Sequence, residues 1–521
     1  MSPAPASVSP FQPELGSAAM EPDLAAFARL YEEGVPQVVW TRLVADLETP
    51  VSAMLKIAHE RPNSFLLESV EGGANRGRYS IIGCEPDLIW RAQGDKAELN
   101  RSPQSDPDGF APAPQPALES LRALLAESKI ALPEGVPPMA AGIFGYMGYN
   151  TVRLIERLPD GKPDDLGLPD SILIRPTLIV IFDSVKDELC VVTPVRPAPG
   201  VSAKAAYARA GERLNLIVER LDQPLPHQSE LHLDIPHPAP CPVTSSDAYM
   251  AKVARAKEYI ASGDIFQVVL SQRFEAPFEL PSFSLYRALR RVNPSPFLYY
   301  LNFGGFAVVG SSPEILVRVR KGEVTIRPIA GTRPRGRTRE EDQALAEELL
   351  ADTKECAEHL MLLDLGRNDV GRVSEVGSVH VTDSFFLEYY SQVMHIVSNV
   401  VGKLAPEHDA VGALMAGFPA GTVSGAPKVR AMEIIDELED SARGIYAGCV
   451  GYFSADGEMD SCIVLRTSVV KDGVMYVQAG AGIVADSVPE KEQTECVNKA
   501  GALFTAADEA VRFAARAKRG Q

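Results

Sequence analysis

The feature that most limits the possible folds is a proline-rich stretch near the middle of the chain. Residues 222–244 read DQPLPHQSELHLDIPHPAPCPVT, and proline interrupts both helices and the hydrogen-bonded ladders of sheets. We therefore expect an interdomain linker here. The expected organisation is a disordered tail over 1–30, an N-terminal domain over 31–222, the linker over 223–244 and a second domain over 245–515.

Runs of strand length occur on both sides of this linker, for example TLIVIF at 177–182 and FQVVLSQRFEA at 266–276. Helical patterns are expected over 118–128, 203–221, 246–262, 339–364, 408–416, 427–437 and 489–515. Strands and helices do not alternate strictly, which disfavours a parallel βαβ sheet. The sequence therefore predicts an α+β fold with large, mostly antiparallel β-sheets surrounded by helices.

Charge and composition exclude several classes of function. The 521 residues carry a formal net charge of −18, which disfavours nucleic-acid binding. No apolar run is long enough to span a membrane, and the N-terminus lacks the features of a secretory signal. Seven cysteines are dispersed without CxxC pairs, as expected for reduced thiols in a cytoplasmic protein. An anionic ligand would need a local cluster of cationic groups.

Two predicted helices each carry a pair of glutamates three residues apart. Glu355 and Glu358 lie in TKECAEHLMLLDLGRNDV, and Glu492 and Glu495 lie in PEKEQTECVNKAGALF. Residues at this spacing share one helix face, so the two pairs together could hold a divalent cation such as Mg²⁺. The ordinary interpretation is a solvated helix face with surface ion pairs such as Glu495–Lys499.

Glycine-rich turns offer backbone N–H groups to an anion. They are QAGAGIVADS at 478–487 and FPAGTVSGAPKVRAMEII at 418–435, and neither matches a nucleotide-binding motif. The stretch RPIAGTRPRG at 327–336 adds arginines that would suit a carboxylate or phosphate. In the same stretch, Gly331 and Thr332 would allow close approach of a ligand.

Four single residues stand in unusual surroundings. Arg466 lies in the apolar run SCIVLRTSVV and, if buried, needs an anionic partner. Tyr446 lies in GIYAGCVGYF, and Glu314 lies between two strands in GSSPEILVRV. His395 is flanked by apolar residues, where a histidine is more often a satisfied core residue than a catalyst.

Eight motifs, taken in order and spacing, resemble the chorismate-utilising enzymes, and most closely the anthranilate-forming members. They are GDIFQVVLSQR, GSSPEIL, RPIAGTRPRG, the helix with Glu355 and Glu358, MHIVS, FPAGTVSGAPK, LRTSV and GAGIVADS, between residues 263 and 487. The resemblance extends to FLLESVEGG and RYSIIG before residue 84, and to NPSPFLYY at 293–300. It implies an enzyme with a chorismate-binding catalytic domain over 245–515. The domain over 31–222 would be intertwined with the catalytic domain, carry tryptophan-binding elements and contact an amidotransferase.

Residue roles follow from the resemblance. It implies that Glu358 and Glu495 coordinate Mg²⁺ with support from Glu355 and Glu492, that Glu314 donates a proton, and that His395 assists elimination. It places in the pocket Gly331, Thr332, Thr422 and Lys499, with Arg466, Tyr446 and Gly480, Ala481 and Gly482 on the enolpyruvyl carboxylate. It assigns inhibition by tryptophan to Glu68, Ser69, Pro296, Phe297 and Leu298.

Two positions distinguish the reactions of this family. Members that add water usually carry a lysine base where this chain has Gln267. Aminodeoxychorismate-forming members, the alternative interpretation, commonly carry a nucleophilic lysine where this chain has Ala330. An alanine leaves C2 open to ammonia itself. No glutaminase motif is present, so the resemblance implies a separate glutamine amidotransferase subunit as the ammonia source. A noncatalytic sensor of chorismate or tryptophan is a further alternative.

Overall fold

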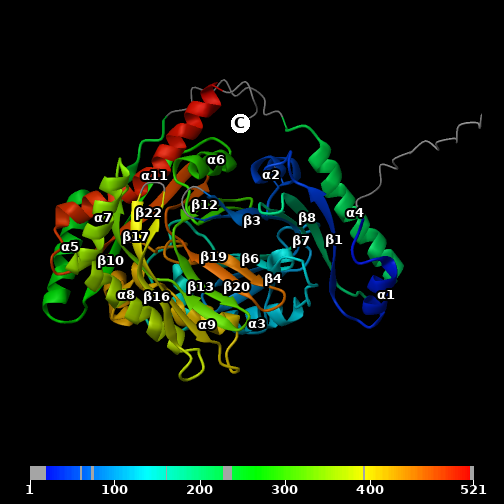
Figure 1. Ribbon diagram of the computed structural model, residues 1–521, viewed down its shortest axis with the longest axis horizontal. Helices are drawn as coiled ribbons and strands as arrows, with labels where there is room; N and C mark the ends of the chain where they lie inside the picture. Colours follow the sequence, from blue (N-terminus) through cyan, green and yellow to red (C-terminus); the bar gives the residue numbers. More distant parts are fainter. Residues whose placement is uncertain are drawn as a thin grey trace, which may run out of the picture.

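The computed structural model describes residues 19–58, 61–71, 75–159, 161–226, 237–390 and 393–516 (Figure 1). Within these ranges the helices are α1 (Leu24–Glu32), α2 (Pro50–Ala58), α3 (Ala117–Glu127), α4 (Ala203–Asp222), α5 (Ser246–Ala261), α6 (Ser282–Val292), α7 (Arg339–Ala351), α8 (Thr353–Gly371), α9 (Ala410–Gly417), α10 (Lys428–Leu438) and α11 (Pro489–Arg516). No helix in this part of the chain has the length and apolar character needed to cross a membrane.

The strands form one continuous network with two long arms. It is built on the pair β3 (Asn75–Gln93) and β7 (Ser171–Asp183). The first arm runs from β3 through β2 (Ser64–Glu71), β11 (Phe297–Asn302), β12 (Ala307–Ser312), β21 (Thr467–Lys471) and β22 (Val474–Ile483) to β10 (Gln267–Pro277). Because β2 pairs with β11, the N-terminal half of the chain is built into this arm.

The second arm starts from β7. It runs through β6 (Gly142–Met147), β19 (Cys449–Ser454), β20 (Met459–Ile463), β13 (Ile315–Arg320) and β14 (Glu323–Ile326) to β17 (Val393–Lys403), which also pairs with β15 (Ile329–Pro334) and β16 (His380–Tyr389). The remaining strands extend the edges of this network. β8 (Glu188–Val195) pairs with β7 and then with β1 (Gln37–Val44), and β4 (Lys96–Asn100) pairs with β3 and then with β5 (Ala111–Pro112). β9 (Cys241–Pro242) and β18 (Gly425–Ala426) each pair with β10. Every pairing among these strands is antiparallel, so the predicted fold class is confirmed.

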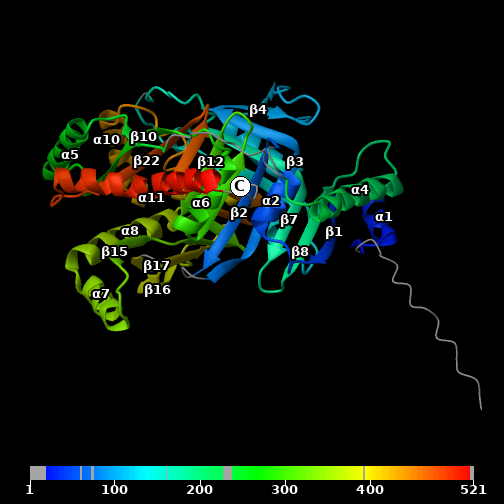
Figure 2. The same ribbon diagram turned by 90° about the horizontal axis from the view of Figure 1, so that it is seen from above.

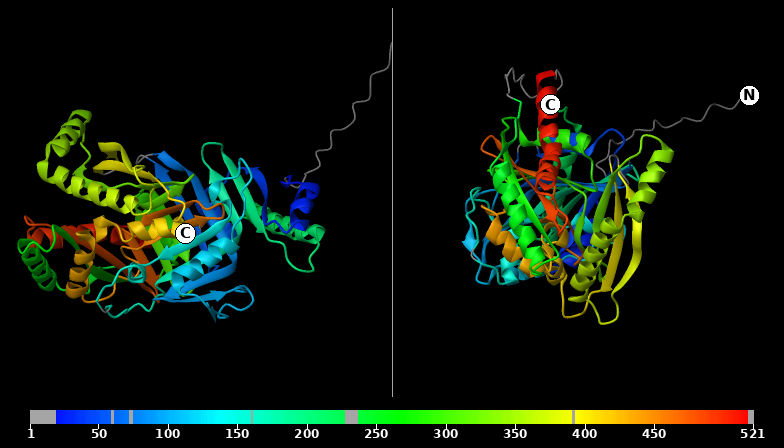
Figure 3. Two further views of the ribbon diagram at one scale, coloured as in Figure 1. Left: turned by 90° about the horizontal axis from the view of Figure 1, so that it is seen from below. Right: turned by 90° about the vertical axis from the view of Figure 1, so that its left-hand side faces the viewer.

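Helices gather at the two ends of the molecule. Figures 1 and 2 show α5, α7, α8 and α11 at one end and α1 and α4 at the other. Seen end-on in Figure 3, α11 (red) and the α7–α8 pair (yellow-green) lie on different sides of the helical end. The strands of the first arm pack on α11, and those of the second arm pack on α8. The two arms thus bring separate parts of the sequence to the same end.

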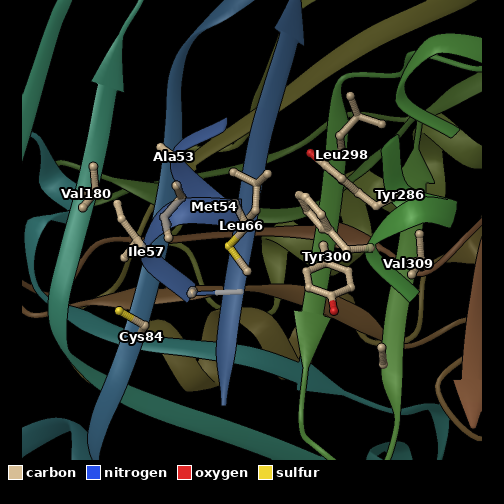
Figure 4. Packing of buried hydrophobic residues seen from close by; sticks show 14 of the residues in the cluster. Ala53, Met54, Ile57, Leu66, Cys84, Val180, Tyr286, Leu298, Tyr300 and Val309 are labelled. Carbon is tan, nitrogen blue, oxygen red and sulfur yellow. The ribbon is translucent and has the colours of Figure 1, made fainter. Parts of the chain in front are cut away.

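A shared core joins the two halves of the chain. Figure 4 shows Leu66 from the N-terminal half next to Tyr300 from the C-terminal half, and Val180, Tyr286 and Val309 belong to the same buried cluster. The same cluster contains Phe27 of α1, which is fully buried. Such interlocking matches the expected intertwined N-terminal domain, while the boundaries at 222 and 245 stay predictions.

Several local expectations differ from the structure. Residues 24–30 of the expected disordered tail form most of α1, because Phe27 and Tyr31 are buried against α4; residues 1–18 of the tail lie outside the described ranges. The helix expected over 339–364 is two helices, since Asp352 leaves helical geometry and caps α8 by accepting from the N–H groups of Lys354 and Glu355. Of the predicted linker, residues 227–236 lie outside the described part.

Candidate active site

The two glutamate pairs face one another from α8 and α11. Burial raises the pKa of the Glu358 carboxyl, and the negative charges of Glu355 and Glu495 raise it further. Burial also raises the pKa of Glu492, again with a contribution from Glu495. The effect of Glu495 on Glu358 shows that the acids of α8 and α11 are close enough for their charges to interact. Glu495 also forms the expected ion pair with Lys499, at 2.7 Å.

Gln267 links this acidic face to the first sheet arm. It is the first residue of β10, and its side-chain amide donates to Glu358 Oε1 at 2.9 Å. Its own Oε1 is buried without a hydrogen-bond partner among the described residues. An unsatisfied buried carbonyl oxygen is costly and points to a partner that comes from outside the chain. A side chain at Gly482 would collide with this amide, with 2.6 Å between the added Cβ and Nε2.

Glu314 lies in the turn between β12 and β13 and is 6% exposed. Burial raises its pKa to about 8, although Thr422 and the N–H of Ile329 both donate to its carboxylate. The Thr422 hydroxyl lies 3.3 Å from Glu314 Oε1. Both residues line a small cavity beside α8. Near neutral pH this carboxyl group is therefore largely protonated and can donate a proton.

His395 lies on β17 with its ring fixed by β15. Its Nδ1 lies 3.1 Å from the Gly331 carbonyl oxygen and 3.0 Å from the Thr332 hydroxyl. A carbonyl oxygen only accepts, so Nδ1 carries the proton and Nε2 is left with a lone pair. Burial lowers the pKa of His395 to about 4, and the charge of Arg466 contributes to the shift. The imidazole is therefore neutral at physiological pH.

Arg466 supplies positive charge between β20 and β21. Burial lowers the pKa of its guanidinium, and no carboxylate forms an ion pair with it among the described residues. Its backbone is in the left-handed region, with φ of +48°, which is strained for an arginine. A half-buried arginine held in this way is suited to an anion that is not part of the chain.

The glycines expected to form a turn at 478–487 lie instead in strand β22, which continues to Ile483 because it pairs with β10, and Gly480 lies beside Tyr446. Gly480 and Gly482 pair with β10 at Ser271 and Val269. A Cβ on Gly480 would lie 2.8 Å from the Tyr446 hydroxyl, so only glycine allows this contact. Lys499 donates to the Gly480 carbonyl oxygen at 3.0 Å. The structure thus brings together the expected binding residues around Gly480, including buried Ala481.

The arginines of RPIAGTRPRG pair with carboxylates of the chain itself, which differs from the free cationic groups expected from sequence. Arg333 binds Asp352 at 2.8 Å, Glu348 at 3.1 Å and Glu355 at 3.4 Å. Arg327 pairs with Glu388, and Arg335 pairs with Asp342 at 2.7 Å. Their role is to hold β15 against α7, α8 and β16. Through Arg333 they also restrain Glu355. Gly331 needs φ of +70°, and a Cβ there would lie 3.3 Å from Glu355 Oε2.

The residues expected to bind tryptophan meet across a strand pair. Ser69 lies opposite Phe297 and Glu68 opposite Leu298 in the β2–β11 register, with Pro296 directly before the strand. Glu68 is already engaged: Arg290 donates to both of its oxygens, at 2.6 and 2.9 Å, and the Tyr286 hydroxyl donates as well. The Ser69 hydroxyl donates to the Tyr79 carbonyl oxygen at 3.2 Å.

Two residues near the site were missed by the sequence analysis. The Tyr390 ring lies edge-on to His395, with 5.5 Å between ring centroids, and Tyr390 also interacts electrostatically with Glu314 and Arg466. Buried Arg443 donates to the Val423 and Val269 carbonyl oxygens, each at 2.7 Å, and so ties the 420–425 loop to β10. The tyrosine pair at 389–390 and the Glu439–Arg443 spacing of one helical turn were the available signals.

Comparison with known proteins places this geometry in a family. The sequence profile described as chorismate binding enzyme matches residues 65–505. The chain belongs to the chorismate binding enzymes. It is 56% identical to an anthranilate synthase component 1 from Cereibacter sphaeroides, over 95% of this chain and 99% of the relative. It is 48% identical to the protein of the same name from Pseudomonas putida, over 89% of this chain and 93% of the relative.

Solved structures agree with this placement. Anthranilate synthase component I from Streptococcus pneumoniae is 38% identical and superposes with a TM-score of 0.72, over 82% of this chain and 92% of that chain. A menaquinone-specific isochorismate synthase from Escherichia coli is 20% identical with a TM-score of 0.68, over 93% and 98% of the two chains. The second comparison speaks for the fold only, and the expected architecture of this family is therefore confirmed.

A divalent cation fits the acidic face of this chorismate binding enzyme. No three histidine, cysteine, aspartate or glutamate side chains form a metal cluster within the described ranges. Mg²⁺ does not require one, because it usually binds one or two carboxylates together with water and substrate oxygens. Glu358 and Glu495 provide two carboxylates whose charges repel each other. A cation between α8 and α11 would relieve this repulsion.

Proposed function

We propose that this chain is the large subunit of an anthranilate synthase, which converts chorismate and ammonia to anthranilate, pyruvate and water. The observation that carries the proposal is the burial of Glu314, which raises its pKa to about 8, next to the β15 strand that carries Ala330, in a chain with Gln267 on β10. Glu314 supplies the acid for the departing hydroxyl. Gln267 and Ala330 stand where other members would carry a lysine, and they cannot act as a base or a nucleophile. The names of the relatives at 56% and 48% identity support the same conclusion.

Substrate binding uses the two charged faces of the site. Arg466 and the segment Gly480–Gly482 of β22 receive the enolpyruvyl carboxylate, with Tyr446 beside them. The ring carboxylate would lie against α8 and α11, where Glu358 and Glu495 would hold Mg²⁺ with support from Glu355 and Glu492. When bound, Mg²⁺ neutralises this carboxylate and lets an acidic protein of net charge −18 hold a dianion. Gly331, Thr332, Thr422 and Lys499 border the pocket.

Amination begins when ammonia attacks C2 of the ring and the C4 hydroxyl leaves. Hydroxide is a poor leaving group, so Glu314 donates its proton and water departs. The burial that raises its pKa to about 8 keeps this proton available at neutral pH. The Thr422 hydroxyl and the Ile329 N–H then stabilise the carboxylate that remains, because both donate to it.

Elimination follows at the same carbon. The C2 proton is removed, the C–O bond to the enolpyruvyl group breaks with release of pyruvate, and the ring becomes aromatic. His395 assists this step through Nε2, the ring nitrogen left free because Nδ1 donates to the Gly331 carbonyl. A pKa of about 4 keeps the imidazole in the neutral form, which can accept a proton.

Ammonia comes from glutamine through a separate amidotransferase subunit, since the component 1 names of the relatives imply a second component. Inhibition by tryptophan acts at the β2–β11 strand pair, where Glu68 and Ser69 lie opposite Leu298 and Phe297. An effector there can act on the site because β11 is linked through β12 and β21 to β22, which carries Gly480.

The proposal is tested by incubating the purified chain with chorismate, Mg²⁺ and a high concentration of ammonium at alkaline pH, followed by product chromatography. We expect fluorescent anthranilate to form without any partner and to disappear on addition of EDTA. A nonfluorescent amino-chorismate would assign the chain to the aminodeoxychorismate-forming members. Unchanged chorismate, with or without an amidotransferase subunit, would refute the enzymatic proposal and favour a sensor.

A further inference from the structure

A second cavity lies between α6, α11 and α2, away from the acidic face. Its volume is about 210 Å³. Helix α6 packs along the C-terminal half of α11 near the end of the described chain (Figure 1). Glu495 precedes Ala510 by 15 residues on α11, a separation of roughly 22 Å along the helix. The cavity is lined by Val51, Ser284, Arg287, Ala288, Arg290, Arg291, Ala510, Phe513 and Ala514.

Three arginines and no acidic residue line this cavity. Arg290 uses its Nε and one terminal nitrogen to bind Glu68, at 2.6 and 2.9 Å. Arg291 lies 3.8 Å from Glu509 and stacks over the Phe513 ring at 4.3 Å. Arg287 forms no ion pair with any residue in the described part of the chain. In a protein of net charge −18, such a local excess of positive charge is unusual.

Helix electrostatics explain only part of this cluster. Arg290 and Arg291 lie in the last turn of α6, where cations stabilise the carbonyl end of a helix. Arg287 lies one turn earlier, where this benefit is small. It is half-buried, and burial together with the charge of Arg291 lowers the pKa of its guanidinium. A cation in these surroundings is stabilised by an anion, and no described residue forms an ion pair with Arg287 to supply one.

The remaining lining is apolar and comes from Val51, Ala288, Ala510, Phe513 and Ala514. A ligand that matches the cavity therefore combines one negative group with a small apolar body. We propose that this cavity binds a small carboxylate with an apolar body, of about the size of benzoate, through Arg287 and Arg290. The bound carboxylate lies one side chain from Glu68, because Arg290 contacts both.

The site is tested first by titration calorimetry with benzoate on the full chain and on three variants. Arg287→Gln should weaken binding at least ten-fold, whereas Arg287→Lys, which keeps the charge, should lose less. Arg213→Gln removes an exposed arginine of α4 and should leave the affinity unchanged. Equal affinity in the wild type and Arg287→Gln, or no binding at millimolar benzoate, would overturn the proposal. Equal affinity for inorganic phosphate would overturn the assignment to a carboxylate with an apolar body.

A second measurement locates the bound benzoate. The two native tryptophans, Trp40 and Trp90, are buried in other clusters, so Phe513→Trp introduces a reporter at the cavity that can keep its cation–π contact with Arg291. Benzoate should change the fluorescence of this variant, and added Arg287→Gln should shift the midpoint at least ten-fold. Calorimetric binding without any fluorescence change would place benzoate elsewhere, for example in the chorismate pocket, and would sink the proposal.

Discussion

Replacing Glu314 with glutamine separates its role as an acid from its role in packing. Glutamine keeps the size of the side chain and an oxygen that accepts from Thr422, but it has no acidic proton. Burial raises the pKa of Glu314 from 4.5 to about 8. This difference corresponds to roughly 5 kcal/mol in favour of the neutral acid.

The sign of the resulting pH dependence is fixed by linkage. The folded pKa lies above the unfolded value, so the folded state keeps a proton that the unfolded chain releases between pH 4.5 and about 8. Stability from Glu314 is fully present below pH 4.5 and is lost as pH rises to about 8, by up to about 1.4 kcal/mol per pH unit. Glu314→Gln has no such loss. Relative to wild type, its free energy of unfolding should therefore rise by up to about 4 kcal/mol between pH 5 and 8.

Denaturant unfolding of both proteins at fixed pH values from 5 to 9 measures this difference. Glu323→Gln, at an exposed glutamate of β14, controls for the general effect of removing a carboxylate. In parallel, kcat of Glu314→Gln should fall by roughly 10²–10⁴ with the concentration of free NH₃ held constant at each pH. If the unfolding free energies of variant and wild type stay parallel across this range, Glu314 is ionised throughout and cannot be the acid.

Three further changes test other parts of the structure. Glu358→Gln should reduce Mg²⁺-dependent turnover at least 100-fold, and calorimetry should show loss of Mg²⁺ binding. The change also removes a buried charge beside Glu355, so the melting temperature at pH 7 should not fall. Ser69→Ala should relieve inhibition by tryptophan in a steady-state assay while kcat is retained, and unchanged inhibition would remove Ser69 from the effector site. Phe27→Ala should cost roughly 3–5 kcal/mol in denaturant unfolding, because Phe27 is fully buried; a loss near zero would mean that α1 is not part of the core.

Local chemistry made much of the secondary structure predictable. The helices expected over 203–221 and 427–437 agree within one residue with α4 and α10, since apolar periodicity and Pro427 mark their bounds. The break at Asp352 was missed because 339–364 reads as one uninterrupted helical pattern. Its cause is the capping bond that Asp352 makes to α8, which competes with helix continuation.

The arginines of RPIAGTRPRG show why partner assignment fails from sequence alone. Arg327 is neutralised by Glu388, 61 positions away, and Arg333 by Asp352, 19 positions away. Nothing in the local pattern distinguishes an arginine that is satisfied within the chain from one that is not. Arg466 looks similar in sequence, yet no carboxylate pairs with it among the described residues. Only the folded arrangement separates the two cases.

The sequence by itself determined the element types, the fold class and which residue types can perform the chemistry. Spacing of three residues places Glu355 with Glu358 on one face, and an alanine at position 330 lacks a nucleophile in any fold. The tertiary structure decided protonation and proximity. Two sheet arms bring β10 and β17 to one end of the molecule, and burial there sets the pKa values of Glu314 and His395 on opposite sides of neutrality. Desolvation depends on every surrounding chain segment, so these properties could not be read from the residues alone.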